Sequence, residues 1–403
     1  MTALVRTLIY GALVAALVFV GWKAYLFFSV NQSPIITISG IAPDGYCVGD
    51  APLIIRGTGA YKIADLRVQL DGKPVVAIND IGSSQFERTF VLPKTLQSGR
   101  HLLRIDVADA SYSRNKSFLE HVIVLDNTPL QIAFVQPFTD FKVLQGRTLR
   151  VQLQANKPMD IVKVRALAGE YQCIPEMPGS LIYECFVPIP CEESPSEYRL
   201  SVEASDRAGA RAVLEGVFQV VSFPFKRQVL RVGQEKLKQE AASGEPQQQL
   251  EIDILQCLKQ SPDKKLWRGN FLIPMEMTGI SCEYGVRRVT QEKGCYAHRA
   301  LDLVGVPKCV VWAPQDGKII IKNRYEHSGN TIVIDHGLGV FTLLFHLDTL
   351  APVQVGEDIR KGNPVGTMGM TGYATGYHLH WEMRINNIPV DPMQWTKDAF
   401  CSQ

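Results

Sequence analysis

The histidines of this chain gather near its C-terminus: six of the eight lie from His298 onward. His378 and His380 stand in a stretch of alternating apolar residues that follows glycines, a pattern that predicts a strand entered from a turn. Residues i and i+2 of a strand share a face, so both imidazoles should point together, while Leu379 and Trp381 face the other side. Two imidazoles on one strand can bind or flank a transition metal. Alone, this spacing is a weak signal.

Two further stretches supply similar residue types. His298 and Asp302 are four residues apart, and in extended chain they can share a face and offer one nitrogen and one oxygen ligand. His346 follows a predicted strand at 340–344. Three protein ligands with an open position for water are the arrangement of a catalytic zinc site. The three stretches together therefore predict a zinc centre built from strands.

At this point the sequence resembles the lysostaphin/LytM-type zinc endopeptidases of bacterial cell walls. The resemblance runs from about Trp267 to Trp395, nearly a third of the chain. The matching segments are 279–288, 298–302, 313–318, 329–337, 346–347, 369–372, 376–380 and 389–392. So many segments in the same order make chance similarity a poor explanation.

The resemblance implies one zinc ion bound by His298, Asp302 and His380, with His346 and His378 as catalytic histidines beside it. Zinc lowers the pKa of its water, and a neighbouring imidazole can take up the proton or stabilise the oxyanion. Which histidine does which stays open. The family fold is a compact, mostly antiparallel β domain with a narrow groove for an extended peptide. The implied substrate is peptidoglycan, cut in its peptide stems or cross-links.

Two positions depart from the family pattern. Ala300 stands where glycine is usual, and Leu344 stands where a tyrosine is often found two residues before the His-Leu pair. The loss of a tyrosine hydroxyl would remove a transition-state donor, which predicts an altered rate or substrate preference. All metal and catalytic positions are nevertheless filled, so we expect an active enzyme.

The N-terminus is strongly apolar. Residues 8–22 carry no charge, and the apolar character resumes at 24–30 after Lys23. As a helix, 8–30 would span roughly 35 Å, enough to cross a bilayer. Arg6 before the run favours a cytoplasmic N-terminus. We expect an uncleaved anchor in the bacterial inner membrane, single-pass, with the bulk of the chain in the periplasm or cell-wall space; a cleaved signal peptide is the alternative.

Between this run and the zinc motifs, residues 33–221 read as short alternating strands separated by turn residues. The stretch 103–109 matches 200–206 as a strand that ends in aspartate, which suggests two tandem Ig-like β-sandwiches. These domains are spacers or binding modules, with a protein as the candidate partner. Of the nine cysteines, Cys173, Cys185 and Cys191 are close enough in sequence to pair if the compartment is oxidising. Leu250, Ile254, Leu255 and Leu258 predict an amphipathic helix in a linker.

The composition limits the function further. A formal net charge of +2 argues against a nucleic-acid-binding protein, because such proteins carry a strong basic excess. The predicted fold is mainly β, in this order: cytoplasmic stub and transmembrane anchor 1–32, Ig-like domains 33–127 and 128–222, linker 223–264, and zinc endopeptidase domain 265–403. Two rival functions remain: a catalytically silent wall-binding regulator or amidase activator, and an adhesion protein whose Ig-like modules carry the function.

Overall fold

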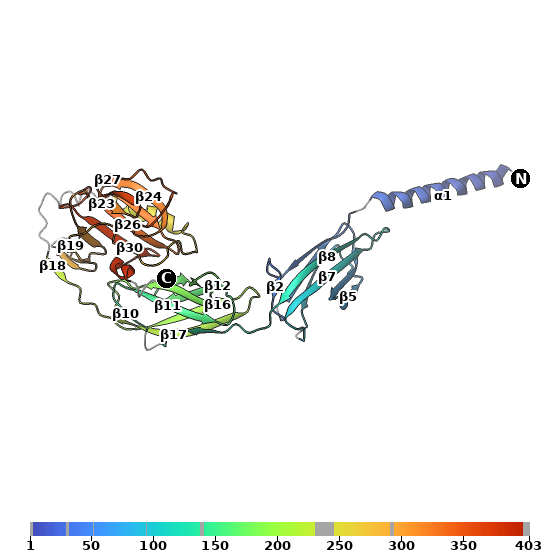
Figure 1. The fold of residues 1–403 in the computed structure, drawn as a ribbon. Helices are drawn as coiled ribbons and strands as arrows, with labels where there is room; N and C mark the ends of the chain where they lie inside the picture. Colours follow the sequence, from blue (N-terminus) through green and yellow to red (C-terminus); the bar gives the residue numbers. More distant parts are fainter. Residues whose placement is uncertain are drawn as a thin grey trace. The chain divides into compact units, whose positions relative to one another are not determined.

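The computed structural model describes residues 3–29, 32–50, 52–93, 95–137, 141–229, 246–290 and 294–397. Strands dominate it, as the sequence predicts (Figure 1). The chain divides into two compact units. The first is Met1–Leu130 with Ser205–Arg211, and the second is Gln131–Ala204 with Ala212–Gln403.

The first unit begins with helix α1, Ala3–Ser29. Its described side chains include many large apolar groups that are exposed, among them Leu17 and Trp22. A search of the described residues finds no helix that is both long enough and apolar enough to span a membrane. The predicted transmembrane anchor is therefore not confirmed.

The rest of this unit is a β-sandwich. One sheet has the order β1 (Ile35–Ser39), β3 (Pro52–Thr58), β6 (Gln85–Val91). The other has the order β2 (Tyr46–Cys47), β8 (Lys116–Leu125), β7 (Gly99–Asp109), β4 (Ile63–Leu70), β5 (Lys73–Asn79). Alternate residues, Leu53 and Ile55 of β3 and Leu103, Ile105 and Val107 of β7, are buried in one shared apolar core, because alternate residues of a strand face the partner sheet.

Two further sheets open the second unit. The first has the order β10 (Lys142–Leu144), β17 (Arg211–Val221), β16 (Glu197–Ser205), β12 (Ile161–Ala166), β13 (Gly169–Gln172). The second has the order β14 (Ile174–Pro175), β15 (Ile182–Pro188), β11 (Thr148–Ala155), β9 (Ile132–Phe134). The predicted repeat falls on β7 and β16, although an Ig-like topology stays a prediction. The eight described cysteines are free thiols, so Cys173, Cys185 and Cys191 are not paired.

The C-terminal domain is built on one large, mainly antiparallel sheet. Its order is β19 (Gly279–Cys282), β22 (Leu301–Val304), β30 (Leu379–Ile385), β26 (Val340–Leu347), β25 (Gly329–Asp335), β24 (Gly317–Tyr325), β28 (Asp358–Ile359), with β31 (Ile388–Val390) paired to β30. Two smaller sheets have three strands each. One has the order β23 (Val310–Trp312), β29 (Pro364–Thr367), β27 (Thr349–Leu350). The other has the order β18 (Arg227–Val229), β20 (Arg287–Thr290), β21 (Gly294–Ala297). A 3₁₀ helix, η2, spans Pro392–Thr396.

The large sheet is covered on both faces. Helix α3, Pro246–Leu258, packs Leu250 and Ile254 against Phe341, Leu343 and Phe345 of the sheet. The amphipathic helix predicted in the linker is thus present, but Leu255 of its predicted apolar face is exposed. A second apolar cluster covers the opposite face of the sheet, so all eight residues of β26 are buried. The charged stretch that precedes α3 lies largely outside the described residues.

Candidate metal centre

Neighbouring strands of the large sheet bring the predicted site residues into one row. Asp302 of β22 is the direct cross-strand partner of His380 on β30, and His380 is in turn the partner of Phe345 on β26. Directly opposed residues of antiparallel strands project from the same face. The His380 ring stacks on Phe345 with centroids 5.1 Å apart, which fixes the plane of the imidazole.

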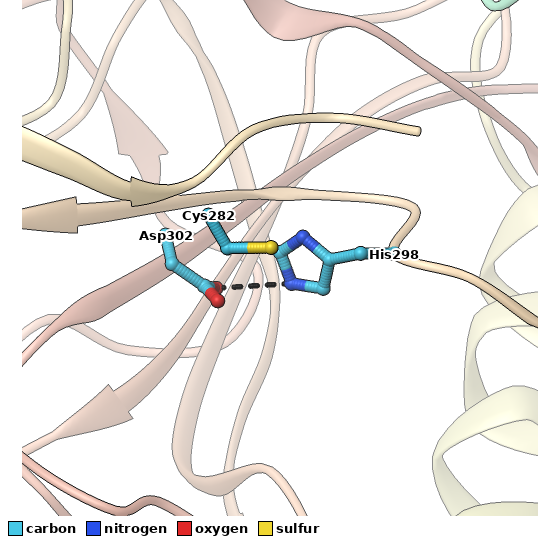
Figure 2. Close-up of side chains that lie close together, drawn as sticks. All are labelled: Cys282, His298 and Asp302. Atoms are coloured by element: carbon cyan, nitrogen blue, oxygen red, sulfur yellow. Dashed lines mark ion pairs between the residues drawn. The ribbon is translucent and has the colours of Figure 1, made fainter. Parts of the chain in front are cut away.

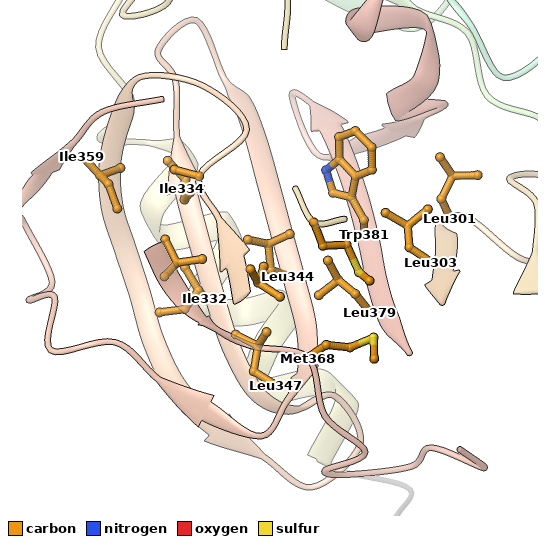
Figure 3. Close-up of a cluster of buried hydrophobic side chains, with 14 of the residues drawn as sticks. Leu301, Leu303, Ile332, Ile334, Leu344, Leu347, Ile359, Met368, Leu379 and Trp381 are labelled. Carbon is orange, nitrogen blue, oxygen red and sulfur yellow. The ribbon is translucent and has the colours of Figure 1, made fainter. Parts of the chain in front are cut away.

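Strand β30 separates polar from apolar residues by simple alternation. His380, Glu382 and Arg384 lie on the face that carries the row. Leu379 and Trp381 lie on the other face, inside an apolar cluster that Figure 3 shows around Leu344, Ile332 and Met368. This is the separation of faces that the sequence predicts. The apolar side holds the strand in place, and the polar side presents the site.

His298 approaches the row from the segment that precedes β22. It is buried, and its Nδ1 lies 3.3 Å from the Glu283 carbonyl oxygen, so Nδ1 is the donor nitrogen. Nε2 is therefore left with a lone pair. This nitrogen is buried, has no hydrogen-bond partner within the described residues, and lies 3.1 Å from Oδ1 of Asp302 (Figure 2).

His380 is held between two carboxylates. Its Nδ1 lies 2.9 Å from Oδ1 of Asp302, and its Nε2 lies 3.2 Å from Oε1 of Glu382. Burial alone would lower the pKa of His380, but the two carboxylates outweigh it and raise the pKa to about 9. Burial likewise opposes ionisation of Asp302, yet the two imidazoles that face its carboxylate, His298 at 3.1 Å and His380 at 2.9 Å, hold the pKa of Asp302 well below its ordinary range. The centre is thus a carboxylate that attracts positive charge from two sides.

These donor atoms fit a zinc ion. Nε2 of His298, Oδ1 of Asp302 and Nδ1 of His380 are the two nitrogens and one oxygen that zinc accepts. Ligands of a tetrahedral zinc lie about 3.4 Å apart, given bonds of about 2.1 Å. The observed 3.1 and 2.9 Å would need to widen by only a few tenths of an ångström. The Nε2–H of His380 would then donate to Glu382, an outer carboxylate of the kind that orients metal-bound histidines.

The two remaining histidines lie beside this group. The rings of His346 and His378 have centroids 4.8 Å apart, and the His346 ring is 5.8 Å from that of His380. Nδ1 of His346 donates to the Thr371 carbonyl oxygen, and Nδ1 of His378 donates to that of Gly376, so Nε2 is the nitrogen that each ring leaves for another partner. Burial, together with the neighbouring histidines, lowers the pKa of His346 to about 3.

The backbone of His346 explains how it reaches the row. Its φ is +61°, in the left-handed region that a non-glycine residue rarely adopts. Regular alternation would send His346 to the same face as Leu344, which is buried in the opposite apolar cluster. The unusual φ instead lets Phe345 and His346 both contact His380. Such conformations are costly and concentrate at functional sites.

Leu344 packs in the apolar cluster on the face of β26 opposite the histidines. The effect of the missing tyrosine hydroxyl on rate or substrate preference stays a prediction. Nearby, His336 is fully buried, and its ring nitrogens bond the Asp316 carbonyl oxygen and the Thr342 hydroxyl.

Several residues of the site escape sequence reasoning. Arg384 donates to Glu382 at 2.7 Å and to Glu251 of α3 at 2.8 and 3.0 Å. Glu382 carries a detectable signal, because it is two residues from His380 and so on the same face. The sequence gives no such signal for Glu251 and Cys282, because their proximity to the site depends on how α3 and β19 pack against the rest of the domain.

Comparison with known proteins identifies this region. The family model described as Peptidase family M23 matches residues 296–392. The C-terminal domain is a peptidase M23 domain. The chain is 37% identical over 127 residues to the DD-carboxypeptidase/endopeptidase Mpg of Neisseria meningitidis serogroup B, covering 31% of this chain and 29% of that protein.

A second relative of this M23 domain is the peptidoglycan DD-endopeptidase ShyC of Vibrio cholerae serotype O1, 32% identical over 120 residues, with 30% of this chain and 28% of the relative covered. The chain therefore spans less than a third of the length of these curated relatives. The solved structure of the antimicrobial peptidase lysostaphin from Staphylococcus simulans is 27% identical and covers 30% of this chain and 49% of that one, with a TM-score of 0.26.

The family match confirms the predicted membership and the predicted zinc cofactor. M23 peptidases are zinc metallopeptidases, and the M23 domain here contains a donor group that can hold the ion. All five predicted site residues, His298, Asp302, His346, His378 and His380, lie within the matched segment.

Proposed function

We propose that this protein is a zinc-dependent endopeptidase that hydrolyses peptide bonds in peptidoglycan stems or cross-links. One observation carries the proposal: Nε2 of His298, Oδ1 of Asp302 and Nδ1 of His380 converge beside two histidines with free Nε2 atoms. The relatives named DD-endopeptidases support peptidoglycan as the substrate class.

The residues would divide the chemistry as follows. When bound by His298, Asp302 and His380, zinc supplies Lewis acidity towards water and the scissile carbonyl. His346 is neutral at pH 7, because burial keeps its pKa low, so its Nε2 can accept a proton. His378 is the more exposed of the pair, and as an imidazolium it would donate a hydrogen bond to the developing oxyanion or the leaving amine.

The experiment uses the purified full chain and isolated cell walls. Release of soluble muropeptides, followed by mass spectrometry, should be abolished by chelation and by His380→Ala, and restored to the chelated protein by zinc. His101→Ala is the matched control, since His101 lies in the first sandwich and pairs with Asp71. Undiminished release by His380→Ala would refute the zinc mechanism. Stoichiometric zinc binding without any release would favour the regulator instead.

We further propose that α1 attaches the chain to the bacterial inner membrane and that the two sandwiches are Ig-like spacers on the periplasmic side. The exposed apolar side chains of α1, such as Leu13, Leu17 and Phe19, support attachment, because exposed apolar surface of this kind seeks a partner. Alkaline extraction of membranes and protease treatment of spheroplasts test both points. A chain that is released by alkali, or protected from external protease, contradicts them.

A further inference from the structure

A cysteine occupies the next position in the row that carries the candidate ligands. Cys282 ends β19, and the register pairs it directly with Asp302 of β22, whose other partner is His380. The three side chains therefore leave three adjacent strands on one face. One donor atom each of Cys282, His298 and Asp302 lies within 4.8 Å of the others, and all three residues are buried (Figure 2).

Within the described residues, the Cys282 thiol makes few hydrogen bonds. One is long, 3.8 Å, to the carbonyl oxygen of the adjacent Glu283, and another joins the thiol to the His298 side chain. Beside it, Nε2 of His298 is buried without a hydrogen-bond partner in the described part of the chain. A buried lone pair of this kind calls for a cation or a donor. The geometry thus offers a sulfur and a nitrogen to the same small volume.

We propose that Cys282 is a fourth protein ligand of the metal ion, completing a set with His298, Asp302 and His380. The inference rests on the proposed function and deepens it. Zinc binds thiolate sulfur readily, and mixed sulfur, nitrogen and oxygen sets are within its usual chemistry. The anionic sulfur and the Asp302 carboxylate together balance the double charge of the ion, which suits a buried site.

A complete set of four protein ligands changes what the centre does at rest. Closed tetrahedral sites hold zinc structurally, whereas catalytic sites keep one position for water. The thiolate of Cys282 would therefore occupy the position that hydrolysis needs, and the substrate would have to displace it. Cys282 is placed to move, because it is the last residue of an edge strand whose register is irregular between Ile280 and Cys282.

The test begins with the metal-free full chain loaded with one equivalent of cobalt(II). A cobalt–thiolate bond gives a near-ultraviolet charge-transfer band that oxygen and nitrogen ligands do not give. We expect the band in the wild type and in Cys309→Ser, a control thiol of the same domain, and its loss in Cys282→Ser. The cobalt dissociation constant should rise at least about tenfold in Cys282→Ser, the lower limit for disturbing a metal-bound residue.

A second measurement needs no variant. X-ray absorption at the zinc edge of the wild-type protein should show one sulfur at about 2.3 Å among nitrogen and oxygen neighbours. Bound metal without a sulfur neighbour, or a charge-transfer band that survives in Cys282→Ser, overturns the assignment of Cys282 and leaves the proposed peptidase intact. Failure of the wild type to bind either metal overturns both.

Discussion

Two sets of paired charges differ in exposure, one on the second sandwich, which the two sheets within residues 132–221 form, and one in the M23 domain. On the sandwich, Arg165 pairs with Glu170 and Glu203, and all three side chains are about half exposed. In the M23 domain, Glu382 and Arg384 pair at 2.7 Å with only 10% and 7% of their side chains exposed. Exposed pairs add little to stability, whereas buried charges need every partner. The contrast therefore predicts that the fold depends more on the Glu382–Arg384 pair than on the pairs of Arg165.

The buried charged groups form a continuous series of contacts. His380 contacts Glu382, Glu382 contacts Arg384, and Arg384 contacts Glu251 on α3. Burial opposes the ionisation of Glu382, but Arg384 and His380 together lower its pKa to about 2. His380, the proposed metal ligand, is therefore oriented through two intermediate groups by the helix that covers the sheet. The linker helix contributes to the site as well as to packing.

Breaking this series of buried contacts should give the largest effect on stability. Arg384→Met leaves the Glu382 carboxylate buried without its cation, and removal of one partner from a buried pair costs about 3–5 kcal/mol. Urea denaturation followed by tryptophan fluorescence measures the loss, because four of the five tryptophans, Trp267, Trp312, Trp381 and Trp395, lie in the C-terminal domain.

A second substitution separates charge from packing. Adding Glu382→Gln to Arg384→Met removes the unpaired charge and should recover a substantial part of the lost stability. If Arg384→Met costs less than about 1 kcal/mol, the range of an exposed pair, the contrast between the two regions fails. If the double variant is no better than the single one, the loss comes from packing.

Much of this site follows from local patterns in the sequence. Alternation along β30 predicts which side chains share the polar face, and helical spacing predicts α3 with Leu250 and Ile254 buried. Both patterns are local, and the covering layers only reinforce them. The order of the strands that place Asp302 beside His380 follows instead from the family resemblance.

The remaining features depend on contacts between distant segments. Cys282 meets Asp302 through an irregular strand register, and Glu251 meets Arg384 across 133 positions of sequence. The positive φ of His346 has no signature in residue type, because histidine has no preference for it comparable to glycine's. Local periodicity cannot encode such placements, since tertiary packing decides them.

The next largest effect on stability is expected from His336, a buried imidazole that stays neutral, and it should appear only at acidic pH. Burial lowers the pKa of His336 to about 4. Between about pH 6.5 and 4 the unfolded chain binds a proton that the folded chain does not, so stability rises with pH across this window and falls as pH drops. The histidine contributes ~3 kcal/mol of acid destabilisation in total.

The measurement compares the wild type with His336→Asn, which cannot titrate. The variant loses packing at every pH, but its free energy of unfolding should depend less on pH between 4.5 and 6.5. The difference between the two proteins isolates His336 from other groups that titrate nearby, such as Asp335, whose pKa burial raises. Parallel pH profiles would mean that His336 does not resist protonation in the folded state.

The smallest effect is expected on the sandwich. Arg165→Gln removes the cation shared by Glu170 and Glu203, yet water solvates all three groups, so the unfolding midpoint of the full chain should not change measurably at physiological ionic strength. Circular dichroism, which follows the strands of every domain, is the appropriate probe. At low salt, the unfolding midpoint of Arg165→Gln is compared with that of a Lys163→Gln variant, because the Lys163 ammonium also pairs with Glu170. A loss as large as that of Arg384→Met would show that exposure does not separate the two regions, and that partner number alone governs how strongly a charge supports this fold.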